Sequence, residues 1–194
     1  MANKRTRALS EEEFFLLLDT INNGFITKDG KRVHKNPQVR MIATLQGNLG
    51  LRISDCINLK LSDIVKEAGR QRLNILEKKT GKKREFTIPE DVYNYILRYM
   101  LEMGIKPNQR LFSIGIRAVQ KHLKITADYL GLEGIGTHSL RKFFCTQIYN
   151  NNQYNIELCR VLMQYSSNLV TQRYIGLQPQ LVEQALQNHV KLPS

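Results

Sequence analysis

A histidine, an arginine and a tyrosine in the C-terminal part of this chain have side chains suited to phosphodiester chemistry. His138 and Arg141 stand at positions i and i+3 of the segment Thr137–Arg141, a spacing that places two side chains on one face of a helix. Tyr174 follows in Thr171–Tyr174, and its hydroxyl is a candidate nucleophile toward a phosphodiester that the other two would hold. This combination predicts the transfer of a DNA strand.

A second arginine stands where it could assist. Arg52 follows a glycine-containing bend, in Gly50–Asp55, where a helix is predicted to begin. Taken alone, an arginine at such a place is more often a surface residue. However, helix starts favour anions, and a guanidinium fork there adds a two-point clamp. Arg52 and Arg141 together could therefore stabilise charge on the non-bridging oxygens of a phosphate without a metal ion.

With 194 residues the chain can bury one sizeable core, so one compact domain with short appendages is expected.

The charge of the chain indicates which kind of partner it binds. It carries 29 Lys and Arg against 17 Asp and Glu, a net charge of +12. Such an imbalance favours a polyanion through steering and counterion release, and double-stranded DNA is the leading candidate. A basic, solvated surface without a nucleic-acid partner is the alternative.

Three features exclude other classes of protein. Cys56, Cys145 and Cys159 are odd in number and widely spaced, so they predict buried thiols in a reducing compartment rather than disulfides or a zinc site. No apolar run approaches the roughly 20 residues that span a bilayer, and the basic N-terminus lacks the apolar core of a signal peptide. No cluster of Asp and Glu resembles a two-metal site. We expect a soluble, cytoplasmic, DNA-associated protein with no cofactor and no metal.

Apolar periodicity and capping residues predict a mainly helical α+β fold. Ser10 and Glu13 form a capping box ahead of an apolar run, so a helix should begin there. Asn36 and Pro37 have the types expected at an N-cap and a first helical position. Further helices are expected over 53–59, from Pro89 to Gly104, and over 116–130, 139–150, 156–163, 169–174 and 180–190.

One β-hairpin is also predicted, and it is the only convincing β-structure. Its strands are expected at 72–76 and 85–88, around a basic, glycine-containing tip at 78–83.

Three short segments, in this order, resemble the three motifs of the tyrosine recombinase (phage integrase) family: Leu49–Asp55, His138–Lys142 and Thr171–Tyr174. The similarity runs from Ala8 to about Gly176. Each motif is weak alone, since His-x-x-Arg occurs by chance in many helical proteins, but the ordered set is specific. The resemblance implies the tyrosine recombinase catalytic-domain fold. It also implies an integrase-type, site-specific recombinase that cleaves and rejoins DNA strands.

The resemblance implies a role for each motif residue. Tyr174 would attack the scissile phosphate and form a 3′-phosphotyrosine, while Arg52 and Arg141 would hold the non-bridging oxygens. His138 would assist proton transfer at the tyrosine, whose ordinary pKa of about 10 makes it a poor nucleophile near neutral pH. Asp55 matches the acidic position of the family and is expected to support the arginines.

The family takes the proton for the leaving 5′-oxygen from a lysine on a β-hairpin. Lys79 begins a Lys-Thr-Gly tip similar to that of lambda-type integrases, so it is the predicted general acid. Lys78, Lys82 and Lys83 share the tip and are assigned to nonspecific phosphate contacts.

This sequence departs from the family at Tyr165, where most members have a histidine or a tryptophan. A tyrosine can donate one hydrogen bond to a non-bridging oxygen or pack as the tryptophan does, but it cannot shuttle protons near neutrality. Tyr165 is therefore a candidate catalytic residue, and an aromatic residue without phosphate contact is the alternative. Lys142, where many members have a second histidine, is a smaller departure.

The expected organisation has three parts. Residues 1–8 form a basic arm or linker stub, residues 9–177 the catalytic domain, and residues 178–194 a C-terminal helix. Family members commonly dock such a helix on a neighbouring subunit in a four-subunit synapse on DNA, so we expect a homotetramer on DNA and a monomer when free. Packing of the helix on its own domain is the alternative.

Two other functions remain as alternatives. A DNA-binding relative with weak or no cleavage would fit Tyr165 and the lack, in this sequence, of the additional helical DNA-clamping domain that most family members carry before this region. A type IB topoisomerase would share the chemistry, but the size of the chain and the spacing of its motifs count against it.

Overall fold

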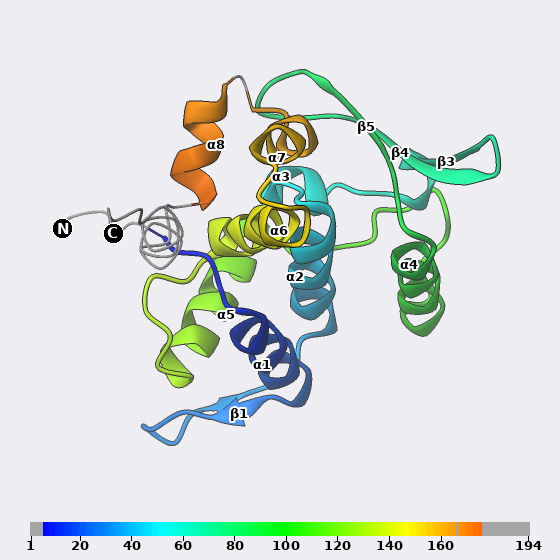
Figure 1. Cartoon of the computed structure of the whole chain (residues 1–194). Helices are drawn as coiled ribbons and strands as arrows, with labels where there is room; N and C mark the ends of the chain where they lie inside the picture. Colours follow the sequence, from blue (N-terminus) through cyan, green and yellow to red (C-terminus); the bar gives the residue numbers. More distant parts are fainter. Residues whose placement is uncertain (1–5, 166, 176–194) are drawn as a thin grey trace, which may run out of the picture.

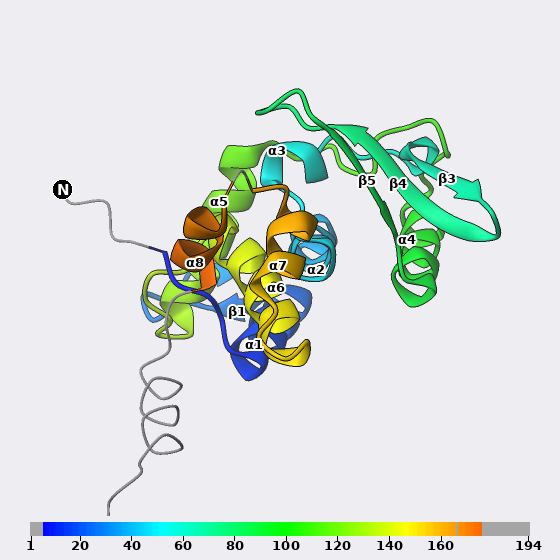
Figure 2. The ribbon, with the colours of Figure 1, turned by 45° about the horizontal axis from the view of Figure 1, so that its top comes forward.

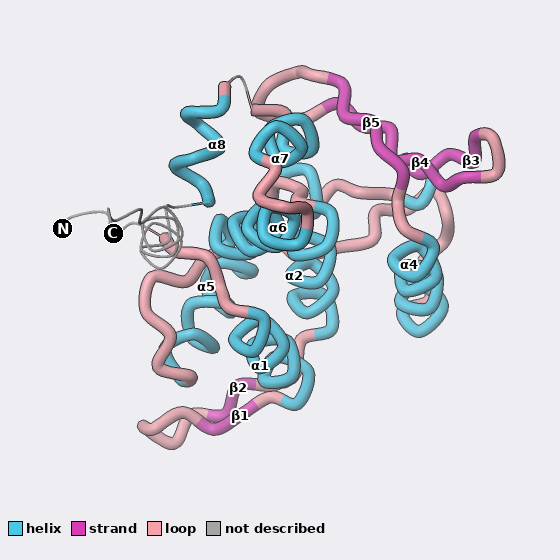
Figure 3. The backbone as a smooth tube through the Cα atoms, in the orientation of Figure 1, coloured by secondary structure: helices cyan, strands magenta, loops and turns pink. Residues whose placement is uncertain are grey.

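A helical bundle forms the body of the protein in the computed structural model, which describes residues 6–165 and 167–175. Four helices make most of it: α1 (Glu11–Asn23), α2 (Pro37–Leu49), α5 (Ile116–Tyr129) and α6 (Thr137–Asn151). Helix α2 packs against α1, α5 and α6 in the middle of the bundle (Figures 1 and 3). The core between them is apolar and includes Leu17, Ile21, Ile42, Leu45, Leu123 and Leu140, all fully buried.

The predicted helix starts are confirmed by their caps. The Ser10 hydroxyl accepts a bond of 3.1 Å from the Glu13 amide, and the Glu13 carboxylate accepts one of 2.9 Å from the Ser10 amide. The Asn36 side chain accepts a bond of 3.1 Å from the Val39 amide at the start of α2. These bonds satisfy donors that a helix start otherwise leaves unpaired.

The predicted hairpin is confirmed as β4 (Arg70–Leu76) and β5 (Lys83–Thr87). However, the expectation of a single hairpin was wrong. A third strand, β3 (Ile64–Glu67), pairs with β4 after the short 3₁₀ helix η1 (Leu61–Asp63), and a separate two-stranded sheet joins β1 (Phe25–Ile26) to β2 (Arg32–Val33). Strands of two to four residues are too short to show an alternating pattern, so their pairing depends on tertiary contacts.

The three-stranded sheet and α4 (Glu90–Met103) stand beside the bundle (Figure 1). In Figure 2 the loop between β4 and β5 reaches back toward α3 (Ile53–Cys56). Helix α3 ends at Cys56, earlier than predicted, and the Leu59 carbonyl accepts a bond of 2.8 Å from the Leu111 amide. The Lys78 amide in the β4–β5 loop donates a bond of 2.9 Å to Asp55 of α3, so one end of the tip is held against the bundle.

Two short helices complete the described chain. Helix α7 (Ile156–Met163) coincides with the prediction, and α8 (Asn168–Ile175) covers the predicted 169–174. Both pack against α6 and against each other. The predicted helix at 180–190 lies outside the described residues. Among the helices of the described part, none is both long enough and apolar enough to cross a bilayer.

Candidate active site

Four of the predicted catalytic side chains converge from three separate elements. Arg52 is the N-cap residue of α3, Lys79 lies in the β4–β5 tip, and His138 and Arg141 lie in the first turns of α6. Partial burial lowers the pKa of His138, and the positive charges of Arg141, Lys79, Lys142 and Arg52 lower it further. The imidazole therefore lies within electrostatic range of all of these groups and is biased toward its neutral form.

Arg141 is held by backbone carbonyls. Its side chain is buried, and its two terminal nitrogens donate to the carbonyl of Gly50 and, at 2.9 Å, to that of Met163. The first carbonyl lies just before Arg52, and the second ends α7. Arg141 thus ties α6 both to the segment that carries the other predicted arginine and to the helix before α8.

Arg84 on β5 is a buried arginine of this site that the sequence interpretation missed. It donates to the carbonyls of Leu49 at 2.9 Å, Gly50 at 3.2 Å and Leu162 at 3.1 Å. Burial lowers its pKa to about 10, and the charge of the nearby Arg141 acts in the same direction. The Gly50 carbonyl therefore accepts hydrogen bonds from both Arg84 and Arg141.

Gly50 can take this place only because it lacks a side chain. Its φ of +58° lies in the left-handed region, and a Cβ atom there would come within 2.4 Å of the Phe144 ring. The glycine-containing bend that suggested an anion site is thus also a close contact between α2 and α6.

Glu77 is a second residue that the sequence interpretation missed. Its side chain is fully buried, and its carboxylate forms ion pairs with Arg52 and, at 3.3 Å, with Arg84. The Thr80 hydroxyl donates a further bond of 2.8 Å to it. Burial raises the pKa of Glu77, but the Thr80 hydrogen bond and the two guanidinium groups outweigh burial, so the net shift is downward.

Asp55 contacts the hairpin. The sequence interpretation expected it to support the arginines; in the structure its Oδ1 accepts a bond of 2.9 Å from the backbone amide of Lys78 and one of 3.3 Å from the Ser54 hydroxyl. The ion pair with Arg52 comes from Glu77 instead.

The lysines of the tip are exposed, as phosphate contacts require. Lys78, Lys79 and Lys82 face solvent, and Lys83 is exposed while it pairs at 2.6 Å with Glu85. The Gln164 amide donates a bond of 2.8 Å to the Lys83 carbonyl, so the hairpin is also fastened at the end of α7.

Tyr165 packs beside Arg141. Its ring lies 5.5 Å from the Arg141 guanidinium carbon, within the range of a cation–π contact. The ring also packs on a small apolar cluster formed by Cys145, Cys159 and Met163. The three cysteines of the chain are buried and free, as predicted.

The backbone of Tyr174 forms part of α8, but its side chain is not among the described parts of the structure. The helix that carries it packs against α6 and α7, the helices of Arg141 and Met163 (Figure 1). Thr171 on the same helix is fully buried. The backbone of α8 is therefore fixed next to the element that carries the histidine and the arginine.

The start of the described chain lies against α6, the helix that carries His138 and Arg141. Lys142 donates to the carbonyl of Thr6, and Arg7 pairs with Glu13 at 2.6 Å while its amide donates to Gly134 at 3.1 Å. The part of the predicted arm that is described thus runs close to the first turns of α6.

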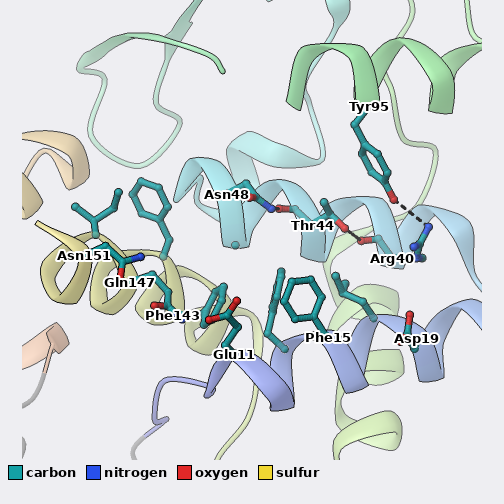
Figure 4. A pocket seen from close by; sticks show the side chains of 15 residues that line it. Glu11, Phe15, Asp19, Arg40, Thr44, Asn48, Tyr95, Phe143, Gln147 and Asn151 are labelled. Atoms are coloured by element: carbon teal, nitrogen blue, oxygen red, sulfur yellow. Dashed lines mark hydrogen bonds between the residues drawn. The ribbon is translucent and has the colours of Figure 1, made fainter. Parts of the chain in front are cut away.

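A separate groove of about 450 Å³ opens between α1, α2, α4 and α6 (Figure 4). Phe15, Phe143 and Phe144 line it, and at one end Arg40 donates a bond of 2.9 Å to the Tyr95 hydroxyl. None of the predicted catalytic residues whose side chains are described lines this groove, so it is not part of the converging site.

The arrangement suits a phosphodiester. Two arginines supply fixed positive charge, a histidine with a lowered pKa can accept a proton, and an exposed lysine can donate one. These are the groups that an attacking hydroxyl, a phosphate and a leaving oxygen need.

Several known proteins are similar to this chain. The model of the Phage integrase family matches residues 7–180. The "Probable integrase/recombinase YoeC" of Bacillus subtilis (strain 168) is 35% identical over 152 residues, which cover 75% of this chain and 81% of that protein. The "Tyrosine recombinase XerC" of Caldanaerobacter subterraneus subsp. tengcongensis is 26% identical over 189 residues.

A solved structure has the same fold. The post-cleavage complex of the XerH site-specific recombinase with palindromic difH substrate matches with a TM-score of 0.74 at 20% identity, over 96% of this chain and 54% of that one. The chain covers 49% of the XerC protein, so it spans about half the length of both Xer relatives. The match to the family and to YoeC shows that the chain belongs to the phage integrase family, the tyrosine-type site-specific DNA recombinases.

Proposed function

We propose that this chain acts as a site-specific recombinase that cuts a DNA strand with Tyr174 and keeps the cut end as a 3′-phosphotyrosine. The observation that carries the proposal is that contacts join α3, the β4–β5 tip and α6, the elements of Arg52, Lys79 and Arg141. Glu77 pairs with Arg52, Asp55 accepts from the tip backbone, and Arg141 donates to the Gly50 carbonyl. A DNA-associated role also fits the net charge of +12 and the cytoplasmic location expected from the sequence.

In the proposed first step the Tyr174 oxygen attacks the scissile phosphorus, and its proton passes to the neutral imidazole of His138. Arg52 and Arg141 stabilise the charge that builds on the non-bridging oxygens. The bond from phosphorus to the 5′-oxygen breaks, and Lys79 protonates that oxygen.

Rejoining reverses these events. A 5′-hydroxyl attacks the phosphotyrosine, and the tyrosine leaves. Because the covalent intermediate retains the energy of the phosphodiester bond, neither step needs ATP as an energy source. When the attacking hydroxyl comes from a different strand, the product is recombined DNA.

We infer that Tyr165 acts through Arg141. Its ring beside the guanidinium supports a packing role like that of a tryptophan. We expect Tyr165→Trp to cleave at least as fast as the wild type. Tyr165→Ala should be slower, because Arg141 would lose a neighbour that limits its movement.

We propose that the active form on DNA is a tetramer, in which residues 178–194 of one subunit dock on the next, and that the free protein is a monomer. The apolar stripe of that segment supports this, with Leu181, Val182, Ala185, Leu186 and Val190 at helical spacing. Sedimentation with and without a recombination site tests it. A chain ending at residue 177 should then bind DNA as lower oligomers than the full chain.

Capture of the covalent complex tests the proposed chemistry. Genomic DNA fragments with random nicks act as suicide substrates, because a short strand beyond the cut diffuses away and prevents rejoining. We expect a denaturation-resistant adduct, and sequencing of its DNA would give the target and the scissile position.

The matched variants are Tyr174→Phe and Tyr129→Phe. The first should form no adduct, while the second, which removes the hydroxyl of an exposed tyrosine on α5, should react normally. Binding without any adduct in the wild type would instead favour a DNA-binding relative that does not cleave.

A further inference from the structure

Glu77 is an unusually placed carboxylate. It follows the last residue of β4 and is fully buried, although an unpaired buried charge is strongly unfavourable. Both of its oxygens have cationic partners, Oε1 with Arg84 and Oε2 with Arg52, and Thr80 also donates to Oε2. One side chain therefore connects a predicted catalytic arginine with the sheet.

The backbone of the same residue closes the tip that carries Lys79. The Glu77 amide donates a bond of 3.0 Å to the Lys82 carbonyl, and the Gly81 amide donates one of 2.8 Å to the Glu77 carbonyl. With the side-chain bond from Thr80, Glu77 makes three contacts within this loop, in addition to the bonds that Asp55 and Gln164 make to its two ends. Lys79 stands inside the loop, between the anchored residues.

A short series of contacts continues from Glu77 to the second arginine. Arg84, the other partner of Glu77, donates to the Gly50 carbonyl at 3.2 Å, and Arg141 donates to the same carbonyl. Arg52 and Arg141 are thus placed relative to each other through Glu77 and Arg84.

We propose that Glu77 is a positioning residue for DNA cleavage, which orients Arg52 toward the scissile phosphate and holds Lys79 at the leaving oxygen. The inference rests on the proposed function. The family resemblance assigns the support of Arg52 to Asp55, but Asp55 contacts the backbone of the tip. In this proposal Glu77 supports Arg52 instead. A displacement of about 1 Å at either group is enough to slow a reaction on the order of 100-fold.

Substrate chemistry can separate this role from simple folding. A 5′-bridging phosphorothiolate has a sulfur leaving group that needs no proton, so it compensates for a misplaced Lys79. A methylphosphonate at the scissile position lacks the charge that Arg52 stabilises, so it compensates for a misplaced arginine. Each is placed at the scissile position identified by adduct sequencing, and single-turnover cleavage is measured beside the natural duplex.

We expect Glu77→Gln to cleave the natural duplex about 100-fold more slowly than the wild type. Its rate relative to wild type should recover roughly tenfold or more on each modified substrate, because each bypasses one of the two displaced groups. Glu67→Gln is the matched control: this carboxylate lies in the same sheet and pairs with Arg72 at 3.2 Å, but it is exposed, so no change is expected.

Glu77→Asp keeps the proposal testable if the glutamine variant does not fold. It retains the negative charge beside Arg84 and only shortens the side chain, so it should keep the circular dichroism and DNA binding of the wild type. We expect it to be slowed about tenfold, with the same recovery on both substrates.

Several results would overturn the proposal. These are a wild-type rate for the folded aspartate variant, equal slowing on all three substrates, or recovery on only one modified substrate, which would contradict a dual role. Failure of the wild type to form any adduct is a different result, because it would contradict the proposed function itself.

Discussion

Arg141 combines two tasks in one guanidinium group. It bonds to the carbonyls of Gly50 and Met163 inside the protein, and the proposed mechanism also requires it to face a phosphate. A planar fork with five donors can do both, whereas an ammonium group is a point charge with three.

Arg141→Lys should therefore slow adduct formation by about 100-fold or more, while DNA binding changes much less. Arg117→Lys, at an exposed position of α5, is the matched control and should react normally. Single-turnover cleavage at saturating DNA measures the effect. An unchanged rate in the Arg141 variant would show that the arginine pair was assigned wrongly.

His138 should give the reaction a characteristic pH dependence. Partial burial and the charges of Arg141 and Lys79 hold its pKa below the ordinary value of about 6.5. The neutral imidazole accepts the tyrosine proton, and a lowered pKa extends this form to more acidic solution. The adduct rate at low DNA concentration should thus stay level through pH 7 and fall only below about pH 6.5.

His138→Gln should remove this acidic decline and lower the plateau, whereas His34→Gln, on an exposed loop, should change neither. A midpoint clearly above pH 6.5 in the wild type would contradict the proposed role of the neutral histidine.

The sequence predicted Arg52, His138 and Arg141 as site residues because the family motifs have fixed local spacing. Glu77 and Arg84 were missed because their importance depends on partners far away in the sequence. One signal was available for Arg84: it stands two positions before Phe86 in β5, so it shares a strand face with an apolar residue. A charged residue on that face indicates a buried ion pair, but the sequence cannot say with which partner.

At the level of elements, local chemistry predicted the helix starts well. Ser10 and Asn36 cap α1 and α2 through bonds to nearby residues, so no tertiary information was needed. The strands β1, β2 and β3 were missed for the opposite reason, because two to four residues carry no period of their own. The position of the β4–β5 tip was also unpredictable, since it depends on contacts of Asp55, Glu77 and Gln164.

Gly50 lies between α2 and α3 and contacts Phe144 of α6, so this position should be sensitive to substitution. Gly50→Ala would place a Cβ atom 2.4 Å from the Phe144 ring and force a residue with a side chain into a φ of +58°. We expect a loss of about 2–4 kcal/mol in the free energy of unfolding, from overpacking and backbone strain together.

Urea denaturation measures this loss, and Gly104→Ala is the control. Gly104 has a similar φ of +64° but no atom within 4 Å of the added carbon, so only the strain term of about 1–2 kcal/mol should remain. Equal losses in the two variants would show that the contact with Phe144 contributes nothing.

At the scale of the whole molecule, the net charge of +12 should make DNA binding strongly dependent on salt. Affinity is expected to fall steeply between about 50 and 200 mM salt, because binding releases counterions from the DNA. Lys82→Gln should reduce the slope of log affinity against log salt by about 1, as expected for one lost phosphate contact. Fluorescence anisotropy titrations at several salt concentrations measure that slope.

Lys124→Gln is the control for charge alone. The Lys124 ammonium already pairs with Asp128 at 2.7 Å, so its loss should leave the slope unchanged. A flat salt response in the wild type, or equal slopes for the two variants, would contradict the tip as part of the DNA-binding surface.

The central claim is that a single tyrosine becomes covalently joined to DNA, and peptide mapping of the trapped adduct tests it most directly. After digestion with trypsin and nuclease, mass spectrometry should find a nucleotide linked through its 3′-phosphate to the peptide that begins at Tyr174, and the released strand should carry a free 5′-hydroxyl. A nucleotide on any other residue, or a linkage through a 5′-phosphate, would contradict the account.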